Sequence, residues 1–127
     1  MFQLLVKEHF NAAHSLRGYQ GKCANIHGHT WIVEILVAGN QLDELGMIID
    51  FGELKKIVKE KTAQLDHQYI NELAEFGDGG LNPTAENIAR YLYRQLQKEL
   101  ANTHPQISLL EVKVWESNSS CAVYKEV

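Results

Sequence analysis

The segment that decides the fold is residues 23–38, which read Cys-Ala-Asn-Ile-His-Gly-His-Thr-Trp-Ile-Val-Glu-Ile-Leu-Val-Ala. Apolar residues dominate from Thr30 to Ala38, which predicts a β-strand whose side chains alternate between two faces. His27 and His29 then project to the same face where this strand begins. Gly28 between them leaves room for the close approach of a ligand or of another segment. The segment therefore predicts a strand that presents two potential metal ligands at its start.

A third imidazole is available from the preceding segment. Alternate residues from Phe2 to His14 share one face of a predicted strand, and a hairpin-like return would bring His14 near His27 and His29. Three imidazoles with a fourth position open to solvent are typical of a catalytic zinc site. A His-x-His pair also occurs by accident on protein surfaces, so on spacing alone both interpretations stay open.

Length, composition and charge bound the class of protein. The chain has 127 residues, of which 45% are hydrophobic and 22% charged, as in an ordinary globular protein. This length predicts a single domain that covers residues 1–127. Its net charge of −4 argues against a general nucleic-acid binder. No apolar run approaches the ~18 residues of a membrane span, and the first residues lack the pattern of a signal peptide. We therefore expect a cytoplasmic protein.

The two cysteines, Cys23 and Cys121, are expected to be free thiols in a reducing cytosol. Cys23 lies in a polar loop flanked by glycine, where a purely structural cysteine gains little from burial. Cys121 lies at the entrance to an apolar strand, where we expect it to pack against the core.

The remaining pattern predicts two strands, two helices and two further strands. Periodicity and turn signals place them at Phe2–Ala12, Thr30–Ala38, Phe51–Gln64, Thr84–Ala101, Ile107–Trp115 and Ala122–Val127. Asp50 with Glu53 resembles a capping box, and Thr84 is the expected N-cap of the second helix. An order without β-α alternation indicates an α+β fold, a four-stranded antiparallel sheet with both helices on one face. A neighbouring subunit could pair its exposed edges.

Three other places could carry chemistry. Asp66 and His67 put a carboxylate beside an imidazole, as in many proton relays, although adjacent strand residues would point apart and a polar loop also accounts for them. Glu116 follows an apolar strand, where it could face a cleft or only solvent. Thr84 opens a helix, and capping explains it without any ligand.

Taken together, these residues resemble the 6-pyruvoyltetrahydropterin synthase family over about residues 2–125. The motifs in the family's order and spacing are Phe10-Asn11-Ala12-Ala13-His14, Cys23-x-x-x-His27-Gly28-His29, Asp50-Phe51, Leu65-Asp66-His67, Asn82-Pro83-Thr84-Ala85-Glu86-Asn87 and Glu116. Each motif alone is weak, whereas the full set in one chain is specific. The three-residue gap after the cysteine is most similar to the bacterial 6-carboxytetrahydropterin synthase branch, which acts in queuosine (7-deazaguanine) biosynthesis.

The resemblance implies the tunnelling fold (T-fold), a ββααββ unit whose sheets join edge to edge into a barrel, commonly in homohexamers made of two trimers. It also implies a zinc cofactor and a pterin substrate. The family's roles fall on these residues: zinc ligation on His14, His27 and His29, catalysis on Cys23, Asp66 and His67, and substrate binding on Glu116 and Thr84.

The implied reaction is a lyase reaction that converts 7,8-dihydroneopterin triphosphate to 6-carboxy-5,6,7,8-tetrahydropterin, acetaldehyde and triphosphate. Zinc would stabilise negative charge on the hydroxyl oxygens of the substrate side chain, and the Cys23 thiolate would remove a proton. One alternative is 6-pyruvoyltetrahydropterin synthase, which shares the zinc, cysteine and glutamate. The other is a pterin-binding module without turnover. Cys23 argues against the module, because binding alone gives the thiol no role.

Overall fold

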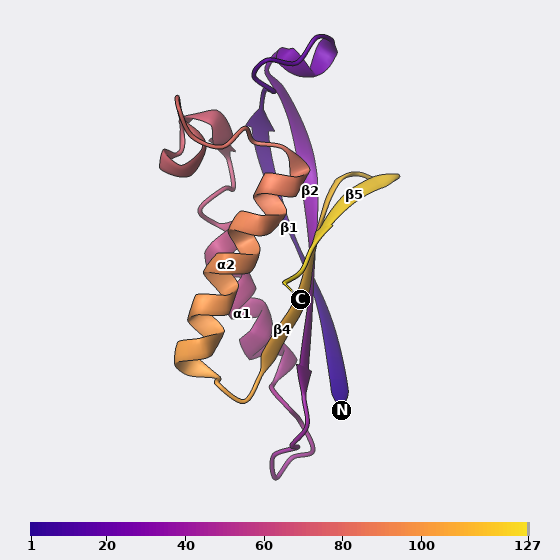
Figure 1. The fold of residues 1–127 in the computed structure, drawn as a ribbon. Helices are drawn as coiled ribbons and strands as arrows, with labels where there is room; N and C mark the ends of the chain where they lie inside the picture. Colours follow the sequence, from indigo (N-terminus) through magenta and orange to yellow (C-terminus); the bar gives the residue numbers. More distant parts are fainter. Residues whose placement is uncertain (127) are drawn as a thin grey trace.

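Two helices lie on one face of a five-stranded sheet in the computed structural model, which describes residues 1–126 (Figure 1). The elements are β1 (Phe2–His14), β2 (His27–Gly39), α1 (Phe51–Thr62), β3 (Gln68–Tyr69), α2 (Ala85–Thr103), β4 (Ser108–Ser117) and β5 (Ser120–Tyr124). Short 3-10 helices lie in the connections, at Lys22–Ala24, Ile70–Glu72 and Ala74–Phe76. The predicted α+β class and the order of the two strands, two helices and two strands are confirmed.

The strand order in the sheet is β3-β1-β2-β4-β5. The pairs β1–β2, β2–β4 and β4–β5 are antiparallel, as predicted. The prediction of four strands is corrected by β3, which pairs in parallel with β1 through Ala12 and Ala13. This edge strand is two residues long, so the sequence around it carries no alternation that could have predicted it.

The β1–β2 hairpin is longer than predicted, and its closed end forms one end of the sheet. Its ladder runs without interruption from Phe2 opposite Gly39 to His14 opposite His27. Each strand therefore extends two or three residues beyond the apolar pattern, because an antiparallel partner satisfies the backbone groups of polar residues equally well. The connection between the strands, residues 15–26, projects beyond the helices (Figure 1).

Side-chain caps fix where the two helices begin. The Asp50 carboxylate accepts a hydrogen bond from the Glu53 backbone N–H (3.1 Å), and the Thr84 hydroxyl accepts one from the Asn87 backbone N–H (3.1 Å). Both predicted N-caps are confirmed, and each satisfies an otherwise unpaired donor of the first helical turn. The buried face of α2 recurs at helical spacing and packs on the sheet through Ile88, Leu92, Leu96 and Leu100.

Trp31 connects the core to the end of the sheet that carries the histidines. It is fully buried and stacks on Phe10, with ring centroids 5.9 Å apart. Its indole N–H donates to the Ala12 carbonyl (3.2 Å). Its ring also lies edge-on to His14 and His29, at centroid distances of 4.9 and 5.2 Å. The imidazoles therefore rest on a packed aromatic layer, which restricts their rotation.

Within residues 1–126, neither helix combines the length and the apolar character that crossing a bilayer requires.

Candidate metal centre

Three imidazoles meet at the end of the β1–β2 hairpin. His14 lies directly opposite His27 in the ladder, and His29 lies opposite Ala12 on the same face. The ring centroids are separated by 4.6 Å (His14–His27), 4.8 Å (His27–His29) and 5.2 Å (His14–His29). The predicted juxtaposition of the three histidines is confirmed, and it follows from strand alternation together with the hairpin register.

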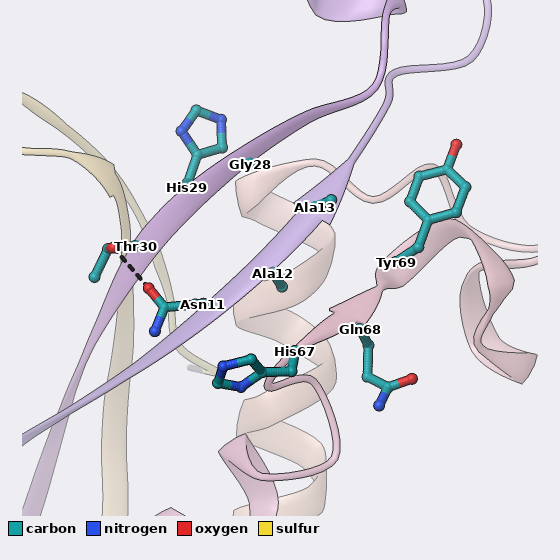
Figure 2. A pocket seen from close by; sticks show the side chains of 9 residues that line it. All are labelled: Asn11, Ala12, Ala13, Gly28, His29, Thr30, His67, Gln68 and Tyr69. Carbon is teal, nitrogen blue, oxygen red and sulfur yellow. Dashed lines mark hydrogen bonds between the residues drawn. The ribbon is translucent and has the colours of Figure 1, made fainter.

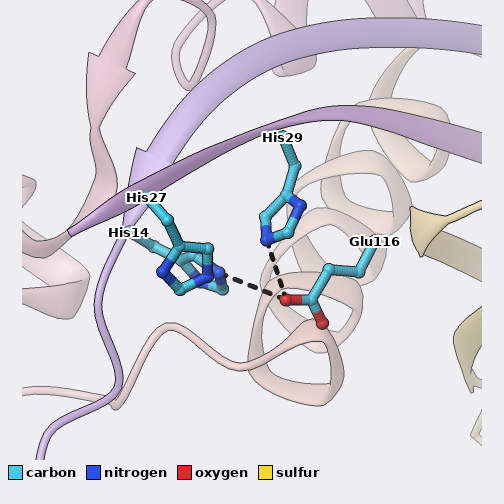
Figure 3. A group of neighbouring side chains, drawn as sticks. All are labelled: His14, His27, His29 and Glu116. Carbon is cyan, nitrogen blue, oxygen red and sulfur yellow. Dashed lines mark ion pairs between the residues drawn. The ribbon is translucent and has the colours of Figure 1, made fainter. Parts of the chain in front are cut away.

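Glu116 joins this group from the end of β4. Its Oε1 atom lies 3.0 Å from His29 Nε2 and 3.3 Å from His14 Nε2 (Figure 3). One ligand atom from each of the four residues lies within 4.8 Å of the others. Glu116 continues the alternation of the buried Val112 and Val114, which places its carboxylate on the face of the histidines. Of its two predicted settings, solvent or a cleft, the structure favours the second.

Two backbone carbonyls orient the imidazoles. His14 Nδ1 lies 2.7 Å from the Pro83 oxygen, and His27 Nδ1 lies 2.7 Å from the Asn25 oxygen. Because a carbonyl oxygen only accepts, each Nδ1 carries the proton and each Nε2 presents a lone pair. This arrangement is the usual support for metal-binding histidines. Neither carbonyl could be predicted from the sequence, because residue types do not indicate where a backbone oxygen will lie.

The electrostatics of the group favour a bound cation. Burial lowers the pKa of His14, although the Pro83 carbonyl opposes the shift, and burial also lowers the pKa of His29 against the influence of Glu116. Both rings are therefore neutral at pH 7, and among residues 1–126 neither Nε2 atom has a hydrogen-bond partner. A lone pair on His14 Nε2 facing a carboxylate oxygen is repulsive unless a positive charge lies between them. Three imidazoles and a carboxylate are a donor set that fits a divalent metal ion.

We call His14, His27, His29 and Glu116 the metal group. A cleft of about 340 Å³ opens beside it. Its lining includes His14, Glu116, Thr84, Arg17 and Tyr19. Thr84 therefore lies in the same cleft as His14 and Glu116, besides capping α2. Arg17 belongs to a loop whose backbone is held by the Asn82 side chain, which accepts from the Arg17 N–H (2.9 Å) and donates to its carbonyl (3.2 Å).

The two cysteines lie in different settings, and both are free thiols. Cys23 is partly buried in the 3-10 helix Lys22–Ala24, and its carbonyl accepts from the Leu16 N–H (2.8 Å), which closes the loop. The thiol does not belong to the group of four potential ligands. Cys121 is exposed on β5, so the expectation that it packs against the core is wrong. The reason is that alternation on β4–β5 turns it to the uncovered face of the sheet, opposite Trp115.

Asp66 and His67 form a direct pair, with His67 Nδ1 3.0 Å from Asp66 Oδ2. The expectation that adjacent residues would point apart is wrong, because His67 has a left-handed backbone conformation (φ 58°) and the chain turns there. The Asn11 N–H donates to Asp66 Oδ1 (2.8 Å), and the His67 N–H donates to the Asn11 carbonyl (2.6 Å). Two hydrogen bonds therefore fasten the pair to β1.

His67 lines a second cleft, of about 600 Å³, together with Asn11, Gly28 and Thr30 (Figure 2). The Thr30 hydroxyl donates to Asn11 Oδ1 (2.7 Å) there, while the His29 side chain projects away from these residues. Within one chain the predicted site residues thus fall into separate places. His14, Glu116 and Thr84 line one cleft, His67 borders another, and Cys23 lies on the loop between β1 and β2.

Asp66 should make stability depend on pH in an acid window. The Asn11 N–H, followed by the His67 ring, lowers the pKa of Asp66 below its ordinary value of 3.8. A carboxyl with a lowered pKa in the folded state contributes stability above its unfolded pKa and loses that contribution as pH falls through the folded value. Chemical denaturation of wild type and Asp66→Asn should therefore show the full difference at about pH 6, and the difference should shrink as pH falls below 3.8. A difference that stays constant over this range would contradict the assignment.

Comparisons with known proteins all indicate the same family. The family profile described as 6-pyruvoyl tetrahydropterin synthase matches residues 3–127. The 6-carboxy-5,6,7,8-tetrahydropterin synthase of Bacillus subtilis is 35% identical over 127 residues, which cover 98% of this chain and 85% of that protein. The protein of the same name from Haemophilus influenzae is 29% identical, over 99% of this chain and all of its own length. The 6-pyruvoyl tetrahydrobiopterin synthase of Dictyostelium discoideum is 35% identical over 107 residues, covering 83% of this chain and 74% of that protein.

Solved structures agree with these relatives. The 6-pyruvoyl tetrahydropterin synthase of Caenorhabditis elegans superposes with a TM-score of 0.83 at 26% identity, over 99% of this chain and 96% of the other. The Plasmodium vivax 6-pyruvoyltetrahydropterin synthase superposes with a TM-score of 0.76 at 26% identity, over 98% of this chain and 97% of the other. The fold is therefore the T-fold of these enzymes, and this chain belongs to the 6-pyruvoyl tetrahydropterin synthase family, whose members bind pterin substrates.

Proposed function

We propose that this protein is a zinc-dependent 6-carboxytetrahydropterin synthase, a cytoplasmic lyase of queuosine biosynthesis. Its substrate would be 7,8-dihydroneopterin triphosphate, and its products 6-carboxy-5,6,7,8-tetrahydropterin, acetaldehyde and triphosphate. The observation that carries the proposal is the group of three histidines and Glu116 beside a cleft that also contains Thr84. The names of the Bacillus subtilis and Haemophilus influenzae relatives favour the carboxy-forming reaction.

The chain's own residues would bind and orient the substrate. A zinc ion held by His14, His27 and His29 would supply positive charge that stabilises oxygen atoms as they become negative. The Glu116 carboxylate can accept hydrogen bonds from the amino group and the N–H edge of the pterin ring, a charge-assisted pairing that fixes its orientation. Thr84 contributes its hydroxyl to the same cleft.

Proton transfer would fall to Cys23 and to the Asp66–His67 pair. As a thiolate, Cys23 would accept a proton from the carbon next to the ring, and His67, oriented by Asp66, would carry protons to or from the reacting oxygens. Because the pair borders a different cleft from Thr84 and Glu116, we propose that sites are completed between subunits of a homohexamer.

The product assay tests the proposed reaction. Zinc-loaded protein is incubated with 7,8-dihydroneopterin triphosphate, and the products are identified by mass. We expect 6-carboxytetrahydropterin, acetaldehyde and triphosphate. The pyruvoyl compound would favour the alternative suggested by the name of the Dictyostelium discoideum relative. Binding of the substrate without release of triphosphate would favour the binding module.

We expect a homo-oligomer, because the sheet leaves strand edges and one face uncovered. Within residues 1–126, β3 pairs with Ala12 and Ala13 of β1 and the Asp66–His67 pair binds the backbone of Asn11, so residues 2–10 present an unpaired edge, and β5 presents another. Leu5 (45% exposed) and Val123 (47% exposed) lie on the face away from the helices. Such edges are normally covered in a stable protein. Sedimentation at micromolar concentration should show an assembly with the mass of a hexamer, whereas a dominant and active monomer of 14.4 kDa would contradict this expectation.

A further inference from the structure

We propose that Glu116 is the fourth metal ligand in the substrate-free enzyme and leaves the metal when a pterin enters the cleft. The carboxylate would then act as a switch, so that the metal opens a coordination position only in an occupied site. This inference rests on the proposed function for the identity of the ligand, a pterin. It goes beyond that function by giving Glu116 two alternative partners.

One carboxylate oxygen of Glu116 faces two of the imidazoles. Glu116 Oε1 contacts both His29 Nε2 (3.0 Å) and His14 Nε2 (3.3 Å), and the second carboxylate oxygen points away from the rings (Figure 3). Since His14 presents a lone pair at Nε2, a cation shared by the rings and the carboxylate accounts for the approach. The four donors are close enough to surround one ion.

Metal ligation and pterin binding place different demands on Glu116. Four protein ligands close a tetrahedral site, whereas a catalytic site keeps one position open for water or substrate. A carboxylate bound to the metal also has fewer lone pairs available for the ring of a pterin. The two roles are reconciled if the carboxylate leaves the metal as the pterin enters, which also opens the coordination position that a catalytic site needs.

The surroundings of Glu116 permit this movement. In the part of the chain that the structure describes, the close polar contacts of the carboxylate are those to the two imidazoles of His14 and His29. The side chain is 33% exposed and stands between two clefts. One cleft contains His14 and Thr84, and the other, of about 300 Å³, contains Cys121 and Val123. A rotation of the carboxylate away from the histidines therefore breaks no other interaction.

Competition for one carboxylate has a reciprocal consequence. If the metal and the pterin compete for Glu116, the pterin lowers the affinity for the metal by the same factor by which the metal lowers the affinity for the pterin. Removing the carboxylate should therefore weaken metal binding even before any pterin is present. If Glu116 bound only the pterin and never the metal, its replacement would leave the metal affinity unchanged.

Cobalt provides the test, because the visible spectrum of bound Co²⁺ reports the number and type of its ligands. The proteins compared are wild type, Glu116→Gln and the control Glu86→Gln, which removes a carboxylate from the lining of the same two clefts but not from the metal group. Co²⁺ affinity is measured by competition with a chelator. The spectrum of each protein is recorded before and after the addition of pterin (2-amino-4-oxopteridine).

We expect Glu116→Gln to weaken Co²⁺ binding by at least about tenfold. Replacing even a residue that only hydrogen-bonds to a metal ligand lowers metal affinity by about 10–100-fold. Glu86→Gln should bind Co²⁺ as wild type does. Pterin should shift the wild-type spectrum toward that of Glu116→Gln and leave the variant's spectrum nearly unchanged.

Two results would contradict the proposed switch of Glu116 without contradicting the metal site. One is equal Co²⁺ affinity and identical spectra for wild type and Glu116→Gln. The other is a wild-type spectrum that does not respond to pterin although calorimetry shows that pterin binds. If wild type itself binds no Co²⁺ and no Zn²⁺, the metal site fails, and the proposed function fails with it.

Discussion

Replacing Cys23 by alanine should lower turnover by about 10²–10⁴-fold, the range that a positioned general base contributes. Affinity for a non-reactive pterin should stay nearly unchanged, because a thiolate that serves as the proposed base would act only in the transition state. Cys23 lies on the closed loop before β2, away from the packed core, so the substitution should leave the fold intact. Single-turnover rates and isothermal binding, measured on the same preparation, separate the two effects.

Cys121→Ala is the matched control for this experiment. It removes the protein's other free thiol, which is exposed on β5. We expect its single-turnover rate to remain close to that of wild type. If Cys23→Ala turns over normally, the proton is removed by another group, and the role proposed for Cys23 is wrong.

Replacing His27 or His29 by alanine should abolish stable zinc binding. Wild type is expected to hold one zinc ion per chain, and either substitution removes one of three imidazoles that converge within a centroid distance of 5.2 Å. A zinc site that loses one of its protein ligands no longer completes its coordination from the chain. Metal analysis after dialysis should therefore show occupancy falling from near one to near zero, with circular dichroism confirming that the variants are folded.

His9→Ala provides the comparison for the zinc measurement. His9 is exposed on β1, but strand alternation places it on the opposite face from His14. Its replacement should leave zinc occupancy at one per chain. Full occupancy in both His27→Ala and His29→Ala would refute the assignment of the metal ligands.

The sequence predicted those parts of the molecule that depend on local periodicity. Alternation along β1 and the His-x-His spacing on β2 placed three imidazoles on one face, and the hairpin register then brought them together. Asp50 and Thr84 predicted both helix starts, since capping acts within four residues.

Features that depend on distant contacts were not predictable in this way. The approach of Glu116 to the histidines requires the β2–β4 register, which contains an irregularity that no sequence pattern announces. The Pro83 carbonyl reaches His14 only because the segment before α2 returns to the end of the hairpin. The left-handed turn at His67 depends on its hydrogen bond to Asn11, far away in the sequence.

The placement of all three histidines in one hairpin has a consequence for the way the chain folds. His14, His27 and His29 lie in the first quarter of the sequence and leave the ribosome before the helices, whereas Glu116 arrives with one of the last strands. A slip of one residue between β1 and β2 would turn one set of side chains to the other face and separate the imidazoles. A metal ion captured early would therefore hold the nascent hairpin in its correct register. Zinc supply during synthesis would then influence the yield of folded protein as well as its activity.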